Sequence, residues 1–141
     1  MQTQENHEIS SSVTQVYVCI TCRKQGEPLE PKEARAGAVL FAALAPHASA
    51  QLNIVPVECL SVCKRPCTVS FAAPDKWTYV YGDLLPGISE ATILAGAQLY
   101  GAAPDGVIPW KQRPDALKKG VVARIPPAPR APSTITQEAA E

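Results

Sequence analysis

The pattern of hydrophobic and polar positions predicts six regular elements in the middle of the chain. Short runs rich in β-branched and aromatic residues predict four strands, over residues 13–19, 51–58, 68–72 and 77–81. Two longer stretches carry apolar residues at helical spacing and predict helices over residues 31–45 and 89–101. The resulting order is strand, helix, strand, strand, strand, helix.

Particular residues mark the ends of the two predicted helices. Pro31 suits a first turn, and Pro46 ends the first helix because proline lacks the N–H that a helix interior needs. The hydroxyl of Ser89 can cap the first amides of the second helix, and Gly101 fits its C-terminal stop. Residues 102–125 contain three prolines, so we expect an extended segment over the core with one helical turn at residues 115–119.

The two ends of the chain differ in composition from the middle. Residues 1–12 are polar and show no periodicity, and residues 126–141 are rich in proline. Neither end can bury much apolar surface, so both are predicted to be disordered tails. This leaves one predicted domain over residues 13–125.

The order of elements predicts an α/β fold. A crossover through one helix makes the first two strands parallel, and a hairpin then adds the next two antiparallel. This is the βαβ-ββα order of a thioredoxin-like core, here followed by an extended C-terminal segment. Because parallel neighbours end at the same edge of a sheet, we expect Cys19 and Cys59, at the ends of the first two strands, to lie close together.

Composition and charge exclude several classes of function. Thirteen Lys and Arg residues balance thirteen Asp and Glu residues, so binding to nucleic acid or to an anionic membrane is not predicted. The longest apolar run, residues 36–45, is far shorter than the roughly 20 residues that a membrane-spanning helix needs. The chain opens without a hydrophobic secretory segment, so we expect a cytoplasmic protein. No Ser-His-Asp order, phosphate-binding glycine loop or carboxylate pair points to an enzyme.

The five cysteines form two closely spaced groups, which are Cys19 and Cys22 in C-x2-C, and Cys59, Cys63 and Cys67 in C-x3-C-x3-C. In a reducing compartment a disulfide framework is not expected. Each short spacing lets two sulfurs converge from one loop onto a single centre. Together, at strand ends that the topology brings together, the two groups predict ligation of a metal centre by four thiolates.

The spacing leaves the chemistry of the centre open. A 2Fe-2S cluster is favoured over zinc, because C-x3-C is less typical of zinc ribbons and this chain has a core without a metal. A dithiol oxidoreductase that uses Cys19 and Cys22, activated by Arg23 and Lys24, is a further alternative. It needs a helix N-terminus at the first cysteine, whereas residues 23–30 predict a loop. Inert burial of unconnected thiols is the remaining alternative.

Several segments resemble known families. A strand-terminal VCITC and the segment VECLSVCKRPCTVSF resemble the thioredoxin-like 2Fe-2S ferredoxins, a group that includes the small cluster-bearing subunit of respiratory complex I. Over about residues 13–127, the chain is more similar to the DUF1636 family of predicted metal-binding bacterial proteins, through VCITCR, ECLSVCKRPC, KWTYVYGDL and PDGVIPWKQRPDALKKGVVARIPP. The resemblance implies electron transfer or metal handling by a carrier rather than an enzyme.

The resemblance also implies a ligand set, which is Cys19, Cys22, Cys59 and Cys63. In the thioredoxin-like ferredoxins the first pair is more widely spaced, and Cys67 has no counterpart among their ligands. Cys67 therefore stays a candidate fifth participant, with packing at the start of the third strand as the alternative.

Two features predict partners. Four basic residues flank the cysteine groups and would offer a docking surface to an acidic redox partner, namely Arg23, Lys24, Lys64 and Arg65. The hairpin of the third and fourth strands has a free edge in this topology, so we expect a homodimer whose seam uses that edge and the segment around Trp110. Residues 102–125 would otherwise cover the edge within one chain.

Overall fold

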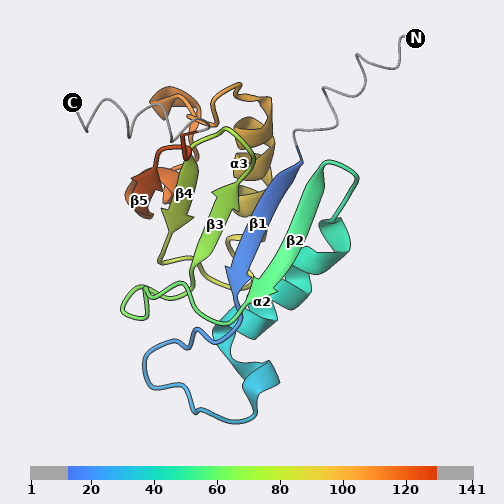
Figure 1. The fold of residues 1–141 in the computed structure, drawn as a ribbon. Coiled ribbons are helices and arrows are strands. Elements are labelled where there is room, and N and C mark those ends of the chain that lie inside the picture. The colour runs from blue at the N-terminus through green and yellow to red at the C-terminus, as the bar shows by residue number, and fades with distance from the viewer. Residues whose placement is uncertain (1–12, 130–141) are drawn as a thin grey trace, which may run out of the picture.

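A computed structural model describes residues 13–129 of the chain as one mixed sheet with helices packed against it (Figure 1). The first predicted tail, residues 1–12, and residues 130–141 of the second predicted tail, 126–141, lie outside the described residues. Residues 126–129, the described start of the second tail, are exposed and form no helix or strand.

The sheet contains five strands, which are β1 (Thr14–Cys19), β2 (Leu52–Val57), β3 (Val69–Ala72), β4 (Thr78–Tyr81) and β5 (Val121–Ile125). Their order across the sheet is β2-β1-β3-β4-β5. β1 and β2 are parallel, and the other three pairs of neighbours are antiparallel. The four predicted strands, the parallel crossover pair and the hairpin are therefore confirmed, as is the α/β fold class.

Short helices connect and cover the strands. The α-helices are α2 (Ala36–Leu44), α3 (Glu90–Ala102) and α4 (Ala116–Lys119), and the 3-10 turns are η1 (Lys32–Ala34), η2 (Ala45–His47) and η3 (Trp110–Gln112). α2 and α3 contact each other and lie on the same face of the sheet (Figure 1). Within residues 13–129, no helix combines the length and the apolar character that crossing a membrane requires.

The first predicted helix differs from the observed one at both ends. Residues 32–34 form the separate turn η1, and the backbone at Arg35 is extended, so α2 begins only at Ala36. At the other end α2 stops at Leu44, and Pro46 lies inside the 3-10 turn η2 that follows it directly.

The ends of the second predicted helix are also corrected. Ser89 occupies the N-cap position, but its hydroxyl accepts a hydrogen bond from the preceding Leu85 N–H (2.9 Å) rather than from the helix. Gly101 does not stop α3, which continues to Ala102. The buried Lys76 donates from Nζ to the carbonyls of Tyr100 and Gly101, at 3.3 and 3.1 Å. The last carbonyls of a helix have no partner within the helix, so Lys76 supplies both a hydrogen-bond donor and a positive charge there.

Residues 102–125 contain the predicted helical turn, as α4, and cover the edge of the hairpin within one chain, but they do so by a strand that was not predicted. The segment ends in a fifth strand, β5, which pairs along β4 from Thr78 opposite Ile125 to Tyr81 opposite Val121. β4 is therefore an interior strand, and the free hairpin edge assumed for a dimer seam does not exist. A homodimer itself stays a prediction.

An aromatic cluster fills the core between the sheet and α3. Tyr79 and Tyr81 project from alternate positions of β4 and stack with ring centroids 5.5 Å apart. Phe71 packs edge-on against Tyr81, Tyr100 packs edge-on against Tyr79, and the Phe71 and Tyr100 rings are tilted toward each other. All four residues are fully buried. Trp110, in contrast, is 59% exposed and does not fill the core.

Candidate metal centre

The parallel register of β1 and β2 brings the two cysteine groups to one end of the sheet. Cys19, the last residue of β1, lies opposite Val57, the last residue of β2, and the Ile20 N–H donates to the Val57 carbonyl (2.9 Å). The hydroxyl of Thr21 donates to the carbonyl of Glu58. The loop after β1 and the loop after β2 are thus joined directly beyond the strand ends, as the topology predicts.

The two loops enclose a small pocket of about 120 Å³. Its lining includes the four predicted ligands, which are Cys19, Cys22, Cys59 and Cys63. The first pair is buried, with 3% and 7% of the surface of Cys19 and Cys22 exposed, whereas Cys59 and Cys63 are exposed. One half of the candidate site is therefore held by the core, and the other half lies on a surface loop.

The sulfurs line this pocket without converging on one point. Within residues 13–129, no three His, Cys, Asp or Glu side chains are close enough together to hold a metal ion. For all four sulfurs to bind one centre, these side chains would therefore have to come closer together.

Cys19 and Cys22 interact directly. A hydrogen bond from the Cys22 thiol lowers the pKa of Cys19 to about 4, against the effect of burial. The same hydrogen bond, together with burial, raises the pKa of Cys22 above its ordinary value. Of this pair, Cys19 is therefore the thiol whose deprotonation is favoured, and Cys22 would have to lose a proton if a metal bound.

Three further polar groups contact the cysteine sulfurs. The hydroxyl of the buried Thr68 lies 3.3 Å from Cys22 Sγ, and the hydroxyl of Thr21 lies 3.5 Å from Cys19 Sγ. The Ser61 N–H donates to Cys59 Sγ (3.2 Å). Hydrogen bonds of this kind stabilise negative charge on sulfur. Thr68 was not identified from the sequence, where its place after Cys67 gave no sign of a contact with Cys22.

The N-terminus of α2 packs against the first cysteine loop. The Gly37 N–H donates to the Cys22 carbonyl (3.0 Å), and a Cβ added at Gly37 would lie 2.0 Å from the Cys19 carbonyl oxygen. Residues 23–30 do form a loop, as predicted, but the loop returns the chain to the cysteines. A glycine within a helical pattern was the signal for this close approach.

Glu27 fixes the start of α2. Its carboxylate accepts hydrogen bonds from the N–H groups of Lys24 (2.8 Å) and Ala36 (3.1 Å), and these bonds lower its pKa. The carboxylate thereby joins the loop to the first amide of the helix. This explains why α2 begins at Ala36 rather than near Pro31.

Removing the Glu27 carboxylate is expected to destabilise the protein in a pH-dependent way. Because folding lowers the Glu27 pKa, the carboxylate stabilises the fold above its unfolded pKa of about 4.5, and this contribution disappears as the pH falls through the folded pKa. Glu27→Ala should lower the free energy of unfolding by about 1 kcal/mol at pH 7, the usual effect of losing an N-cap. Urea denaturation at pH 7 and pH 3 checks this, and an equal difference at both values would contradict it.

Cys67 lies apart from the pocket. It is 1% exposed, belongs to the hydrophobic core, and exchanges backbone hydrogen bonds with Leu84. Burial raises the pKa of its thiol to about 11. Its side chain is absent from the lining shared by the other four cysteines.

The four predicted basic residues occupy different situations. Arg23 lines the pocket, whereas Lys24 and Lys64 are exposed on the two loops. Arg65 forms an ion pair with Asp83 (2.7 Å), which offsets its charge. All four residues therefore lie on the two cysteine loops, with Arg65 held by a neighbour, and a docking role for them stays a prediction.

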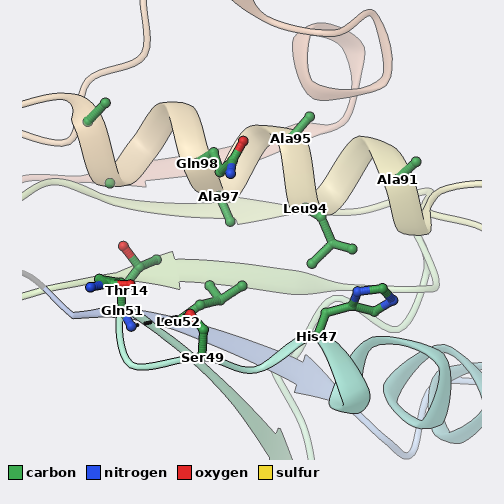
Figure 2. Close-up of a pocket in the computed structure, with 12 residues that line it drawn as sticks. Thr14, His47, Ser49, Gln51, Leu52, Ala91, Leu94, Ala95, Ala97 and Gln98 are labelled. Atoms are coloured by element: carbon green, nitrogen blue, oxygen red, sulfur yellow. Dashed lines mark hydrogen bonds between the residues drawn. The ribbon is translucent and has the colours of Figure 1, made fainter.

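A larger groove of about 800 Å³ lies at the opposite end of the sheet (Figure 2). It separates α3 from the start of β1 and β2, and the side chains of Leu94 and His47 point into it from opposite walls. No cysteine lines the groove, so it is separate from the candidate metal centre.

Comparisons with known proteins agree with the fold. The family model DUF1636, described as a protein of unknown function, matches residues 16–127. A thioredoxin-like [2Fe-2S] ferredoxin from Aquifex aeolicus is 18% identical, with 83% of this chain and 97% of that chain covered and a TM-score of 0.52. A cysteine-to-serine variant of the thioredoxin-like [2Fe-2S] ferredoxin from the same organism is 20% identical, covers 78% and 98%, and has a TM-score of 0.50. No curated protein matches the chain.

Proposed function

The chain belongs to the DUF1636 family, and we propose that it is an electron carrier in which Cys19, Cys22, Cys59 and Cys63 hold a 2Fe-2S cluster. The observation that carries this proposal is the pocket that these four thiols line at the ends of two parallel strands. The similar structures, described as thioredoxin-like [2Fe-2S] ferredoxins, support it.

The residues present fit such a cluster in type and number. Four soft sulfur ligands from two loops suit iron-sulfur ligation, and a protein-bound cluster supplies one-electron transfer. The buried pair would anchor the centre, and the exposed loop with Cys59 and Cys63 would close on it. Thr68, Thr21 and the Ser61 N–H are placed to stabilise charge on the sulfurs, and Arg23 adds a positive charge to the pocket wall.

Zinc is the second candidate for the same site. Four thiolates also suit structural zinc, which would give a metal-handling or metal-stabilised protein without redox activity. The hydrogen-bonded Cys19–Cys22 pair additionally supports a dithiol oxidoreductase as the candidate for a metal-free protein.

Metal content and spectra distinguish these functions. Full-length protein purified without oxygen is expected to be brown, to contain two irons per chain, and to give a rhombic EPR signal after one-electron reduction. A colourless protein with one zinc per chain would overturn the electron-carrier proposal. A metal-free protein that forms a reversible disulfide between Cys19 and Cys22 would favour the dithiol function.

A further inference from the structure

β5 brings a second basic segment to the end of the sheet that carries the cysteines. The paired positions Val18, Val69, Tyr81 and Val121 form one row across β1, β3, β4 and β5. Three strand spacings of about 4.8 Å separate β1 from β5, a distance of about 14 Å. Lys118 and Lys119 lie just before Gly120 and Val121, so they are at the same end of the sheet as the cysteine loops, although more than fifty residues separate them from Cys67 in sequence.

A direct contact joins this segment to the second cysteine loop. Arg65, which lies between Cys63 and Cys67, donates from Nη2 to the Lys119 carbonyl (3.3 Å). The Gly82 N–H donates to the Gly120 carbonyl (2.8 Å), and the Asp83 N–H donates to the Arg65 carbonyl (2.9 Å). The loop, the end of β4 and the start of β5 therefore form one continuous surface.

Trp110 adds an exposed aromatic side chain to this basic region. Its ring lies 5.2 Å from the Arg113 guanidinium carbon and 5.5 Å from Lys118 Nζ. Arg113 is itself anchored, because it donates to the Ile108 carbonyl (2.9 Å) and to the Tyr79 hydroxyl (3.2 Å). An exposed tryptophan held between cations is the type of residue that dominates protein interfaces.

The charge of the region contrasts with that of the whole chain. Residues 107–125 contain five basic residues and one acidic residue, whereas the complete chain has no net charge. Lys119, whose carbonyl accepts from Arg65, and Lys64, which precedes Arg65 in sequence, are both exposed. We call the group Lys64, Trp110, Lys118 and Lys119 the basic surface.

We propose that the basic surface binds the acidic face of a partner protein, with Trp110 as the aromatic contact. Charge complementarity selects the partner, because clustered lysines attract a protein whose surface is negatively charged and favour its encounter with this region. The identification of this partner as a redox protein rests on the proposed function. One electron would then pass between the partner's redox centre and the cysteine-bound centre, without bond formation or proton transfer. A nucleic acid is disfavoured because the whole chain lacks the positive charge on which phosphate binding depends.

Titration with an acidic peptide tests the basic surface. The chain contains two tryptophans, so Trp77→Phe in the full-length protein leaves Trp110 as the only one. Octaglutamate added at low ionic strength is expected to change Trp110 fluorescence saturably. Lys64→Gln with Lys119→Gln should weaken binding about tenfold, since two exposed ion pairs contribute about 0.7 kcal/mol each.

A matched control carries the same change of net charge elsewhere. Gln51→Glu with Gln98→Glu lies in the groove at the opposite end of the sheet and should leave peptide binding within twofold of the parent. Any of three results would overturn the proposal. These are equal weakening of peptide binding in both double variants, no saturable peptide binding by the parent, and tighter binding of a DNA oligonucleotide of equal charge than of the peptide. Iron content of the same samples reports separately on the proposed function, because the peptide measurement does not require a bound cluster.

Discussion

Cys59→Ser and Cys19→Ser are each expected to remove nearly all bound metal from the protein. In the proposed site, each substitution would replace one of the four sulfur ligands by a hydroxyl, which is a far poorer ligand for iron or zinc. Cys59 is the sharper test because its side chain is exposed, so its replacement leaves the core intact. Cys19 is 3% exposed, and its replacement also disturbs the hydrogen bond with Cys22.

Cys67→Ala is the matched control. Cys67 is buried outside the pocket, so we expect a modest loss of stability and unchanged metal content. The measurement is metal per chain together with visible absorbance, with circular dichroism to confirm folding. Full metal content in Cys59→Ser would refute the ligand set. Loss of metal in Cys67→Ala, with retention in Cys63→Ser, would instead assign Cys67 as the fourth ligand.

Gly37→Ala is expected to destabilise the protein strongly and to lower its metal content. Alanine usually stabilises a helix relative to glycine by about 0.5–1 kcal/mol. At Gly37 the added Cβ would lie 2.0 Å from the Cys19 carbonyl oxygen and 3.1 Å from the Cys22 Cβ. Either α2 or the cysteine loop must move, so we expect the free energy of unfolding to fall by about 2 kcal/mol or more.

Gly101→Ala provides the comparison for Gly37→Ala. It also lies in a helix, but the nearest atom to its added Cβ is the Thr14 hydroxyl at 3.3 Å, which can shift. Its stability should change by less than about 1 kcal/mol, with unchanged metal content. Urea denaturation and metal analysis of both variants measure the two effects. Equal stability of Gly37→Ala and the parent would show that α2 does not pack closely on the cysteine loop.

Local patterns were sufficient for most of the fold. The β-branched run before Cys19 and the apolar run before Cys59 predict buried strands, and one intervening helix makes them parallel. This reasoning also predicts that both cysteine groups lie at one sheet end, where four of the five cysteines line one pocket. The argument holds because chain connectivity and handedness restrict the crossover to very few arrangements.

Helix ends were less predictable, because distant side chains decide them. Ser89 satisfies the Leu85 N–H before its helix, and buried Lys76 extends α3 past Gly101. Glu27 starts α2 from nine residues upstream. Each of these contacts involves a residue outside the apolar spacing that predicts the helix. The preferences of residue types for helix ends therefore could not reveal them.

The chain's residues and their spacing were thus enough for four of the five strands, the parallel pair and the meeting of the two cysteine groups at one end of the sheet, because these follow from local periodicity and chain connectivity. Tertiary packing decided the rest. A five-residue strand after a proline-rich segment pairs with β4, which removes the expected dimer edge and places Lys119 beside the Cys63 loop. Packing also buries Cys67 and presses Gly37 against Cys19. These outcomes depend on which surfaces meet in three dimensions, and such long-range contacts leave little trace in neighbouring residues.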